Sequence, residues 1–181
     1  MNEMSRLDSL KVKIFADGAD LEGIIKLHAN PMVKGFTTNP TLMRKAGITD
    51  YESFARKLVT AVPDRPIALE VFADDLPTME KQARVIQAWG PNINVKIPVT
   101  NTQGEFTGPI VERLSASGVV VNVTAVFTLE QVRAIETCLH PETAAIVSVF
   151  AGRIADTGID PVPLMAEAVR ILAAKPLSHI H

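Results

Sequence analysis

The sequence of 181 residues has a single cysteine, Cys138, and few aromatic residues, which make up 5% of the chain. One cysteine excludes an internal disulfide framework and is typical of a protein of a reducing compartment. No apolar run reaches the length of a membrane span, and Met1–Arg6 lacks the pattern of a signal peptide. We therefore expect a cytoplasmic protein that does not bind a membrane.

An excess of charge is also missing, because the formal net charge is −2 and charged residues make up 21% of the chain. The sequence has neither a basic stripe nor basic residues interleaved with aromatic ones, which argues against a nucleic-acid-binding protein. Hydrophobic residues make up 47% of the chain. This composition and length predict one sizeable core in a globular protein.

Short β-rich runs alternate with helical patterns along the whole chain, without a linker or a low-complexity tract. Strands are predicted over Val12–Ala16, Val33–Thr37, Ile67–Phe72, Ile93–Val99, Val119–Thr124 and Ala144–Phe150. Helices are predicted over Leu21–Leu27, Tyr51–Val62, Pro77–Trp89, Pro109–Ala116, from Thr128 onward, and over Pro161–Ala173. From the third strand on, the units repeat at about 26 residues, the size of a strand with its returning helix. The apolar strands predict a parallel sheet that is covered on both faces, in one domain over residues 1–181.

Such a repeat fits either a (β/α) barrel of the TIM type or a doubly wound open sheet. No glycine-rich phosphate fingerprint follows the first strand, where Asp17–Asp20 stands instead, so the barrel is favoured. A closed barrel needs eight strands. We count about six, and Pro176–His181 resembles the beginning of a seventh. The chain is therefore expected to lack strands seven and eight, as a truncated barrel or one whose gap neighbouring chains cover.

Lys96 lies within the apolar run Ile93–Val99 with no carboxylate near it in the sequence. A charged ammonium is costly to bury in such a strand. A buried amine that is kept neutral is a nucleophile toward carbonyl groups and can form a Schiff base. The alternative is a side chain that extends to the edge of the sheet and reaches water.

Each predicted strand brings a polar residue to its carboxyl end, where barrel enzymes place their chemistry. Residues two apart share a face of a strand, so Asn94 with Lys96 and Asn122 with Thr124 point to one side. The other candidates are Asp17, Asn39, Glu70, Ser148, and Arg153 in the loop after the sixth strand. Taken one at a time, each has a structural alternative: a helix cap for Asp17, a turn for Asn39, backbone hydrogen bonds for Thr124 and Ser148, and solvent for Arg153. Their common placement predicts a shared site.

The chemistry of these groups is consistent with a class of carbon–carbon bond reactions. Lys96 would attack a ketone and form an iminium that withdraws electrons from the adjacent bond. Glu70, through a water bonded to Thr124, could act as general acid and base, and Asp17 could accept a hydroxyl proton. Asn39, Asn122 and Ser148 would hold sugar hydroxyls, and Arg153 could bind a phosphate.

Five segments resemble the transaldolase family and occur in the family's order. They are Phe15–Asp17, Thr37–Leu42, Asn94–Pro98, Asn122–Thr124 and Ser148–Ile154. The resemblance implies a class I aldolase-type barrel that needs neither a metal nor an organic cofactor. It implies a reaction in which a dihydroxyacetone unit passes from a ketose phosphate to an aldose phosphate in the pentose phosphate pathway.

The resemblance also implies a role for each candidate. Lys96 matches the Schiff-base lysine, Glu70 and Thr124 the acid–base pair that holds a water, and Asp17 the residue that assists cleavage. Asn39, Asn122, Ser148, Phe150 and Arg153 match substrate-binding positions. Fructose-6-phosphate aldolases of the family tend to have glutamine and tyrosine where this chain has Glu70 and Phe150, which favours transfer over simple cleavage.

Two alternatives stay open at this stage: an aldolase of the fructose-6-phosphate type, and an inactive truncated barrel. The family resemblance implies sugar phosphates as partners and a homo-oligomer. His179 and His181 have a spacing that suits a metal, but we interpret two histidines at the end of the sequence as incidental.

Overall fold

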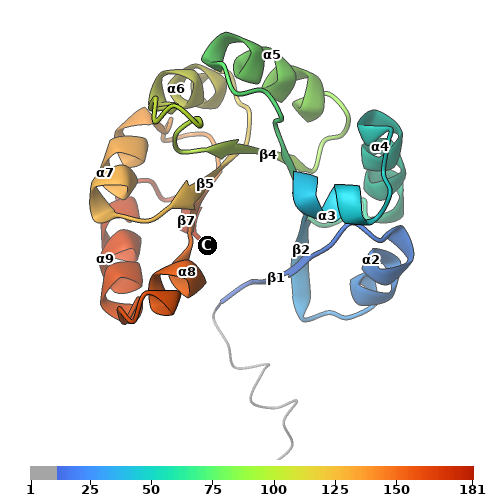
Figure 1. The fold of residues 1–181 in the computed structure, drawn as a ribbon, viewed down its shortest axis with the longest axis horizontal. Helices are drawn as coiled ribbons and strands as arrows, with labels where there is room; N and C mark the ends of the chain where they lie inside the picture. The colour runs from blue at the N-terminus through green and yellow to red at the C-terminus, as the bar shows by residue number, and fades with distance from the viewer. Residues whose placement is uncertain (1–11) are drawn as a thin grey trace, which may run out of the picture. The chain divides into compact units, whose positions relative to one another are not determined.

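The computed structural model describes residues 12–181, which divide into two compact units. The described part of the first unit is residues 12–70 with 88–93, and the second unit is residues 71–87 with 94–181. Each unit consists of parallel strands connected by helices, as Figure 1 shows. That the whole chain is one domain stays a prediction.

The first unit contains three parallel strands in the order in which they occur in the chain. They are β1 (Ile14–Asp17), β2 (Val33–Thr37) and β3 (Ile67–Glu70). Its helices are α2 (Leu21–His28), α3 (Pro40–Lys45) and α4 (Tyr51–Ala61). In the register of the strands, Asp17 lies beside Thr37, and Thr37 lies beside Ala68.

Side-chain caps fix where the helices of the first unit begin. Asp20 accepts a hydrogen bond from the backbone N–H of Gly23 at 2.9 Å, Asn39 from Leu42 at 2.9 Å, and Asp50 from Ser53 at 3.0 Å. Such caps satisfy backbone donors that have no partner within the helix. The cap of α2 is therefore Asp20 and not Asp17, which overturns the structural alternative for Asp17.

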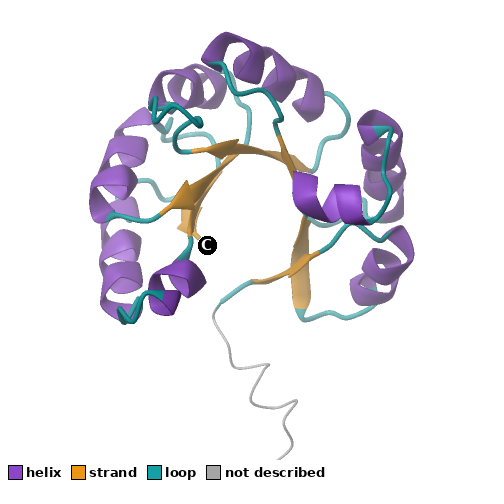
Figure 2. Ribbon diagram, viewed as in Figure 1, coloured by secondary structure: helices purple, strands orange, loops and turns teal. Residues whose placement is uncertain are grey.

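The second unit contains four parallel strands, again in chain order. They are β4 (Ile93–Pro98), β5 (Val121–Val126), β6 (Ala145–Val149) and β7 (Ser178–Ile180). The helices are α5 (Leu76–Gln87), α6 (Gly108–Ala116), α7 (Leu129–Cys138), α8 (Ala151–Asp156) and α9 (Val162–Leu172). Figure 2 shows that α6, α7 and α9 of this unit lie on one side of its strands.

Alternating side chains give the strands of the second unit one apolar face. Val95, Ile97, Val121 and Val123 have no measurable exposure to solvent. Helix residues such as Leu114 and Ile135 are also fully buried and belong to the same core. Because successive side chains of a strand point to opposite sides, the opposite face receives Asn94, Lys96, Asn122 and Thr124.

The pairing of β5 with β6 is interrupted immediately after Thr124. The register shifts between Val123 and Val126, and Ala125 has a φ of 58°, in the left-handed region. Among the described residues other than glycine, Ala125 alone has a positive φ. Such bulges re-aim side chains at the ends of strands and are common near functional sites.

The predicted alternation of strands and helices is confirmed. The expectation that strand seven is lacking is wrong, because Ser178–Ile180 forms β7 and pairs with β6. Residues 12–181 contain no eighth strand. The third strand ends at Glu70 rather than Phe72, and the fifth is Val121–Val126 rather than Val119–Thr124. Two short helices, α3 and α8, were not predicted, because a helix of six residues is too short to show an apolar period. Of the helices in the described part of the chain, none is both long and apolar enough to span a bilayer.

Candidate active site

Lys96 lies in the middle of β4 and is 9% exposed, so its side chain is buried. Its neighbours Val95 and Ile97 point to the opposite face and belong to the core. On the adjacent strand, Lys96 is in register with Asn122. Of the two alternatives that the sequence left open, this exposure favours the buried lysine over a side chain that reaches water at the edge of the sheet.

A polar pair lies next to Lys96 on the same face. Ser148 Oγ donates a hydrogen bond of 2.7 Å to Asn122 Oδ1, and both side chains are buried. The hydroxyl of Ser148 therefore binds a side chain rather than neighbouring backbone, which was its structural alternative. Thr124 is also buried, at 4% exposure, two residues after Asn122. The second unit thus brings Lys96, Asn122, Thr124 and Ser148 onto one buried polar face.

Phe150 and Arg153 follow at the carboxyl end of β6, and the structure places them differently from each other. The Phe150 ring is 37% exposed and contacts the ring of Phe127. We predicted that Arg153 lies in a loop, and this is wrong. It lies on α8, which begins directly after Phe150. Its side chain is 75% exposed and lies 3.7 Å from Asp156 at the nearest N···O distance. In this structure Arg153 is therefore a solvent-facing residue.

Sequence reasoning missed a histidine that reaches the same face. His181 continues the pairing of β7 with β6, since its N–H donates to Val147 O at 2.9 Å and its carbonyl accepts from Val149 N at 2.8 Å. This pairing places His181 beside Ser148 on the polar face. Although His181 is exposed overall, partial burial and the nearby charge of Lys96 lower its pKa. Its placement depends on the register of β7 against β6, which no local pattern of the sequence specifies.

The first unit holds the other three candidates at the ends of its strands. Asp17 ends β1 and is exposed, and Glu70 ends β3 and is half-buried. The side chain of Asn39 caps α3, a structural role different from the turn that we considered as its alternative.

Glu70 also has a backbone partner in the first unit. The Tyr51 hydroxyl donates to Glu70 O at 3.0 Å, and the Tyr51 ring packs edge-on against Trp89 at a centroid distance of 5.0 Å. Burial raises the pKa of Tyr51, so the phenol keeps its proton and remains a donor. This contact fixes the end of β3, and with it the residue that carries the carboxylate.

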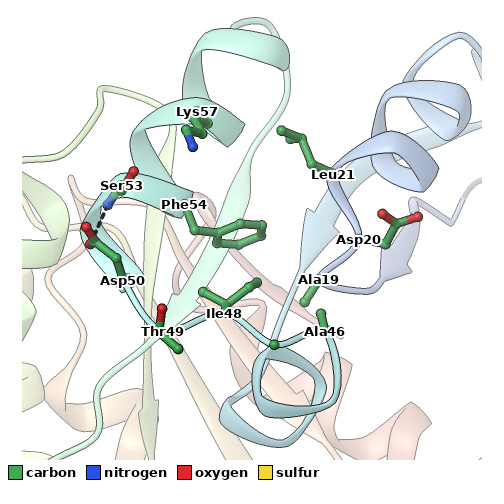
Figure 3. Close-up of a pocket in the computed structure, with 11 residues that line it drawn as sticks. Ala19, Asp20, Leu21, Ala46, Ile48, Thr49, Asp50, Ser53, Phe54 and Lys57 are labelled. Carbon is green, nitrogen blue, oxygen red and sulfur yellow. Dashed lines mark hydrogen bonds between the residues drawn. The ribbon is translucent and has the colours of Figure 1, made fainter.

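A hollow of about 370 Å³ lies elsewhere in the first unit and is shown in Figure 3. The Phe54 ring lies near its centre, between Ile48 and Leu21. Asp20 and Asp50 at its edge are the caps of α2 and α4. None of the residues that we predicted to be in the site lines this hollow, and its two carboxylates are helix caps.

Comparison with known proteins connects these residues to a family. Residues 14–178 match the family model described as transaldolase/fructose-6-phosphate aldolase. A "Probable transaldolase" of Dehalococcoides mccartyi is 40% identical over 160 residues, which are 88% of this chain and 70% of that protein. The chain belongs to this transaldolase family. A second "Probable transaldolase", from Methanococcus maripaludis, is 35% identical over 163 residues, or 90% of this chain and 71% of that protein.

Solved structures share the fold at much lower sequence identity. One, described as a dihydrodipicolinate synthase family protein from Coccidioides immitis, has a TM-score of 0.54 at 14% identity. The match covers 94% of this chain but 61% of that one. The structure named "QR15, an Aldolase" has a TM-score of 0.50 at 10% identity, over 93% of this chain and 89% of its own. The predicted fold class, an α/β fold of the TIM type, is confirmed.

The match to the transaldolase family model contains every candidate that the sequence indicated, from Asp17 to Arg153. His181 lies beyond the matched range. Within residues 12–181, no group of three or more histidine, cysteine or acidic side chains is arranged to hold a metal ion. The chemical groups of the polar face are an amine, amides, hydroxyls and an imidazole.

Proposed function

We propose that this chain is a transaldolase, which transfers a dihydroxyacetone unit from a ketose phosphate to an aldose phosphate through a Schiff base on Lys96. The observation that supports the proposal most is a buried lysine on a polar strand face, in a member of the transaldolase family. Transaldolases and fructose-6-phosphate aldolases, the two activities of this family, both break a carbon–carbon bond that is one carbon removed from a ketone. A lysine iminium supplies the electron sink that this cleavage needs.

The proposed reaction begins when the Lys96 amine attacks the ketone carbon and water leaves, which forms an iminium. The bond between the third and fourth carbons of the sugar then breaks, and its electrons move into the iminium to give an enamine. The hydroxyl on the fourth carbon loses its proton as the aldehyde product forms. The enamine carbon then attacks the aldehyde of an acceptor, and hydrolysis of the new iminium frees the lysine.

Other residues have the roles that the family resemblance gives them. Glu70 is proposed as the general acid–base group, and Asp17 as the acceptor of the hydroxyl proton. Thr124 is proposed to hold the water of the acid–base step, while Asn122 and Ser148 orient sugar hydroxyls. Asn39 and Phe150 complete the proposed substrate contacts, and Arg153 is proposed as a phosphate ligand.

Several wider expectations remain part of this proposal. We propose sugar phosphates as the substrates, the pentose phosphate pathway as the setting, and the cytoplasm as the location. A homo-oligomer is proposed as the working state. Light scattering on the purified chain tests the oligomer directly, because a monomer would contradict it.

The alternative within the family is a fructose-6-phosphate aldolase, which releases dihydroxyacetone instead of transferring it. The two are separated by supplying fructose 6-phosphate with and without erythrose 4-phosphate as acceptor. A transaldolase is expected to form product only when the acceptor is present, whereas a lyase releases dihydroxyacetone in either case. Activity that ignores the acceptor would contradict the transferase assignment. The variant Lys96→Met is expected to be inactive in both assays, with Lys57→Met as the control lysine, which lies on α4 of the first unit.

A further inference from the structure

Two phenylalanine rings stand together where β5 and β6 end in the second unit. The centroids of Phe127 and Phe150 are 5.5 Å apart, and the ring planes meet at 71°, an edge-to-face arrangement. Phe127 is 41% exposed and Phe150 is 37% exposed. Aromatic pairs of this geometry attract one another beyond the burial of their surface. The pair is thus a defined structure, although much of it faces solvent.

Hydrogen bonds hold the backbone of both phenylalanines in place. Phe127 N–H donates to Gln131 Oε1 at 2.8 Å, and the same oxygen accepts from Thr128 N–H as part of a capping box on α7. Phe150 N–H donates to Val126 O at 2.8 Å, which extends the pairing of β6 with β5 by one residue. Both rings are therefore carried by backbone segments that hydrogen bonds fix in position.

The two rings lie at the carboxyl end of the polar face. Phe150 follows Ser148 by two residues, and its N–H still pairs with β5, so its side chain leaves the sheet on the side of Ser148. Phe127 follows Thr124 by three residues, just beyond the bulge at Ala125. The pair thus forms an apolar wall at the carboxyl end of a face that contains Lys96, Asn122 and Ser148.

We infer that Phe127 is a positioning residue that determines specificity: through its edge-to-face contact it fixes Phe150 as a wall that keeps water from the three-carbon intermediate on Lys96. This inference rests on the proposed function. The enamine on Lys96 has two fates after the first aldehyde leaves. Its carbon either bonds to an acceptor aldehyde, whose oxygen takes up a proton, or is itself protonated. In the second case water adds to the iminium carbon, and dihydroxyacetone and the free amine are released. A dry wall favours the first fate over the second.

The test is the ratio of dihydroxyacetone released to dihydroxyacetone transferred, measured with fructose 6-phosphate and erythrose 4-phosphate. Phe127→Leu keeps an apolar side chain but removes the ring, and Phe127→Met is a second variant of the same kind. Both are expected to raise the ratio by about two- to tenfold, the size of one edge-to-face contact. Phe127→Tyr keeps the ring and is expected to restore the ratio of the unmodified protein. This ratio does not depend on how much of a variant is folded.

A double variant tests whether Phe127 acts through Phe150. If it does, Phe127→Leu is expected to change the ratio little once Phe150→Leu is present, because the two effects are not additive. Val169→Ala, at an exposed apolar residue on α9, is the control that should leave the ratio unchanged.

The possible failures can be told apart by trapping the intermediate with borohydride. An adduct on Lys96 together with an unchanged ratio in Phe127→Leu and Phe127→Met would overturn this inference alone. If the unmodified protein forms no adduct, the proposed function fails and this inference fails with it.

Discussion

At the scale of single residues, burial decides which polar groups need an explanation. Lys96, Asn122 and Ser148 are all less than 10% exposed, although polar side chains are costly to remove from water. The hydrogen bond between Ser148 and Asn122 offsets part of that cost, and the strand register brings Lys96 beside the same amide. Buried polar groups are costly unless they are hydrogen-bonded, and such clusters are common at functional sites, which supports a site there.

Ala125 offers a test of backbone strain beside this face. A residue with a Cβ atom at a φ of 58° is strained, by about 1–3 kcal/mol. Glycine relieves the strain but adds conformational freedom to the unfolded chain. We therefore expect Ala125→Gly to raise the free energy of unfolding by at most about 1 kcal/mol. Ala125→Val is expected to lower it by at least about 1 kcal/mol, because β-branched residues avoid this region.

Urea unfolding of both variants of Ala125 measures these differences. Ala134→Gly and Ala134→Val, on α7, provide the matched control, since glycine in a helix is expected to destabilise. A destabilising Ala125→Gly paired with a neutral Ala125→Val would contradict the strained conformation.

His181 predicts a dependence of stability on pH. Its pKa is lowered in the folded state by burial and by Lys96, so the unfolded chain binds more protons than the folded one below about pH 6.5. Stability is therefore expected to fall as the pH drops from 6.5 through the lowered pKa. His181→Gln removes this contribution. Melting temperatures of the two proteins, measured from pH 7.5 to 5, should converge or cross as the pH falls, and parallel curves would contradict the account.

At the scale of elements, ion pairs connect helices within the second unit. Glu80 of α5 accepts hydrogen bonds from Arg84 of the same helix at 2.8 Å and from Arg113 of α6 at 2.6 Å. Its side chain is 18% exposed, whereas those of the two arginines are about half exposed. One carboxylate with two guanidinium partners is more favourable than an isolated surface pair.

Glu80→Gln is expected to lower the free energy of unfolding by about 1 kcal/mol at pH 7, because it removes charge from both contacts. Arg113, then Arg84, lower the pKa of Glu80. This contribution is therefore present above the ordinary glutamate pKa and is lost as the pH falls through the lowered value. Chemical denaturation at pH 7 and pH 3 measures both effects. Glu52→Gln, in an exposed pair on α4, is the control and should change less. Equal losses in the two variants at pH 7 would contradict the bridging role.

The elements also show what the sequence can and cannot predict. Strands such as β4 and β5 were predictable because a run of valine and isoleucine has few other conformations. The period of two then placed Lys96 and Asn122 on one face, as the register confirms. The bulge at Ala125 was not predictable, because alanine carries no signal for a left-handed backbone. Arg153 was placed in a loop because nothing in the sequence indicates a helix as short as α8.

At the scale of the whole chain, pairings between distant segments were the least predictable part. The contact of Phe127 with Phe150 joins segments that are 23 positions apart, and His181 lies beside Ser148 of the neighbouring strand. Both depend on the register of β5, β6 and β7, which no local pattern specifies. The family match over residues 14–178 contains Phe127, Ser148 and Phe150, whereas His181 lies beyond it.

The measurement that tests the central claim most directly is the reduction of the purified chain with borohydride in the presence of fructose 6-phosphate, followed by peptide mass spectrometry. The account predicts a three-carbon adduct on the peptide that contains Lys96, and no adduct in Lys96→Met. The same amount of adduct should form in Lys57→Met. An unmodified Lys96 peptide, or an adduct on any other lysine, would contradict the account.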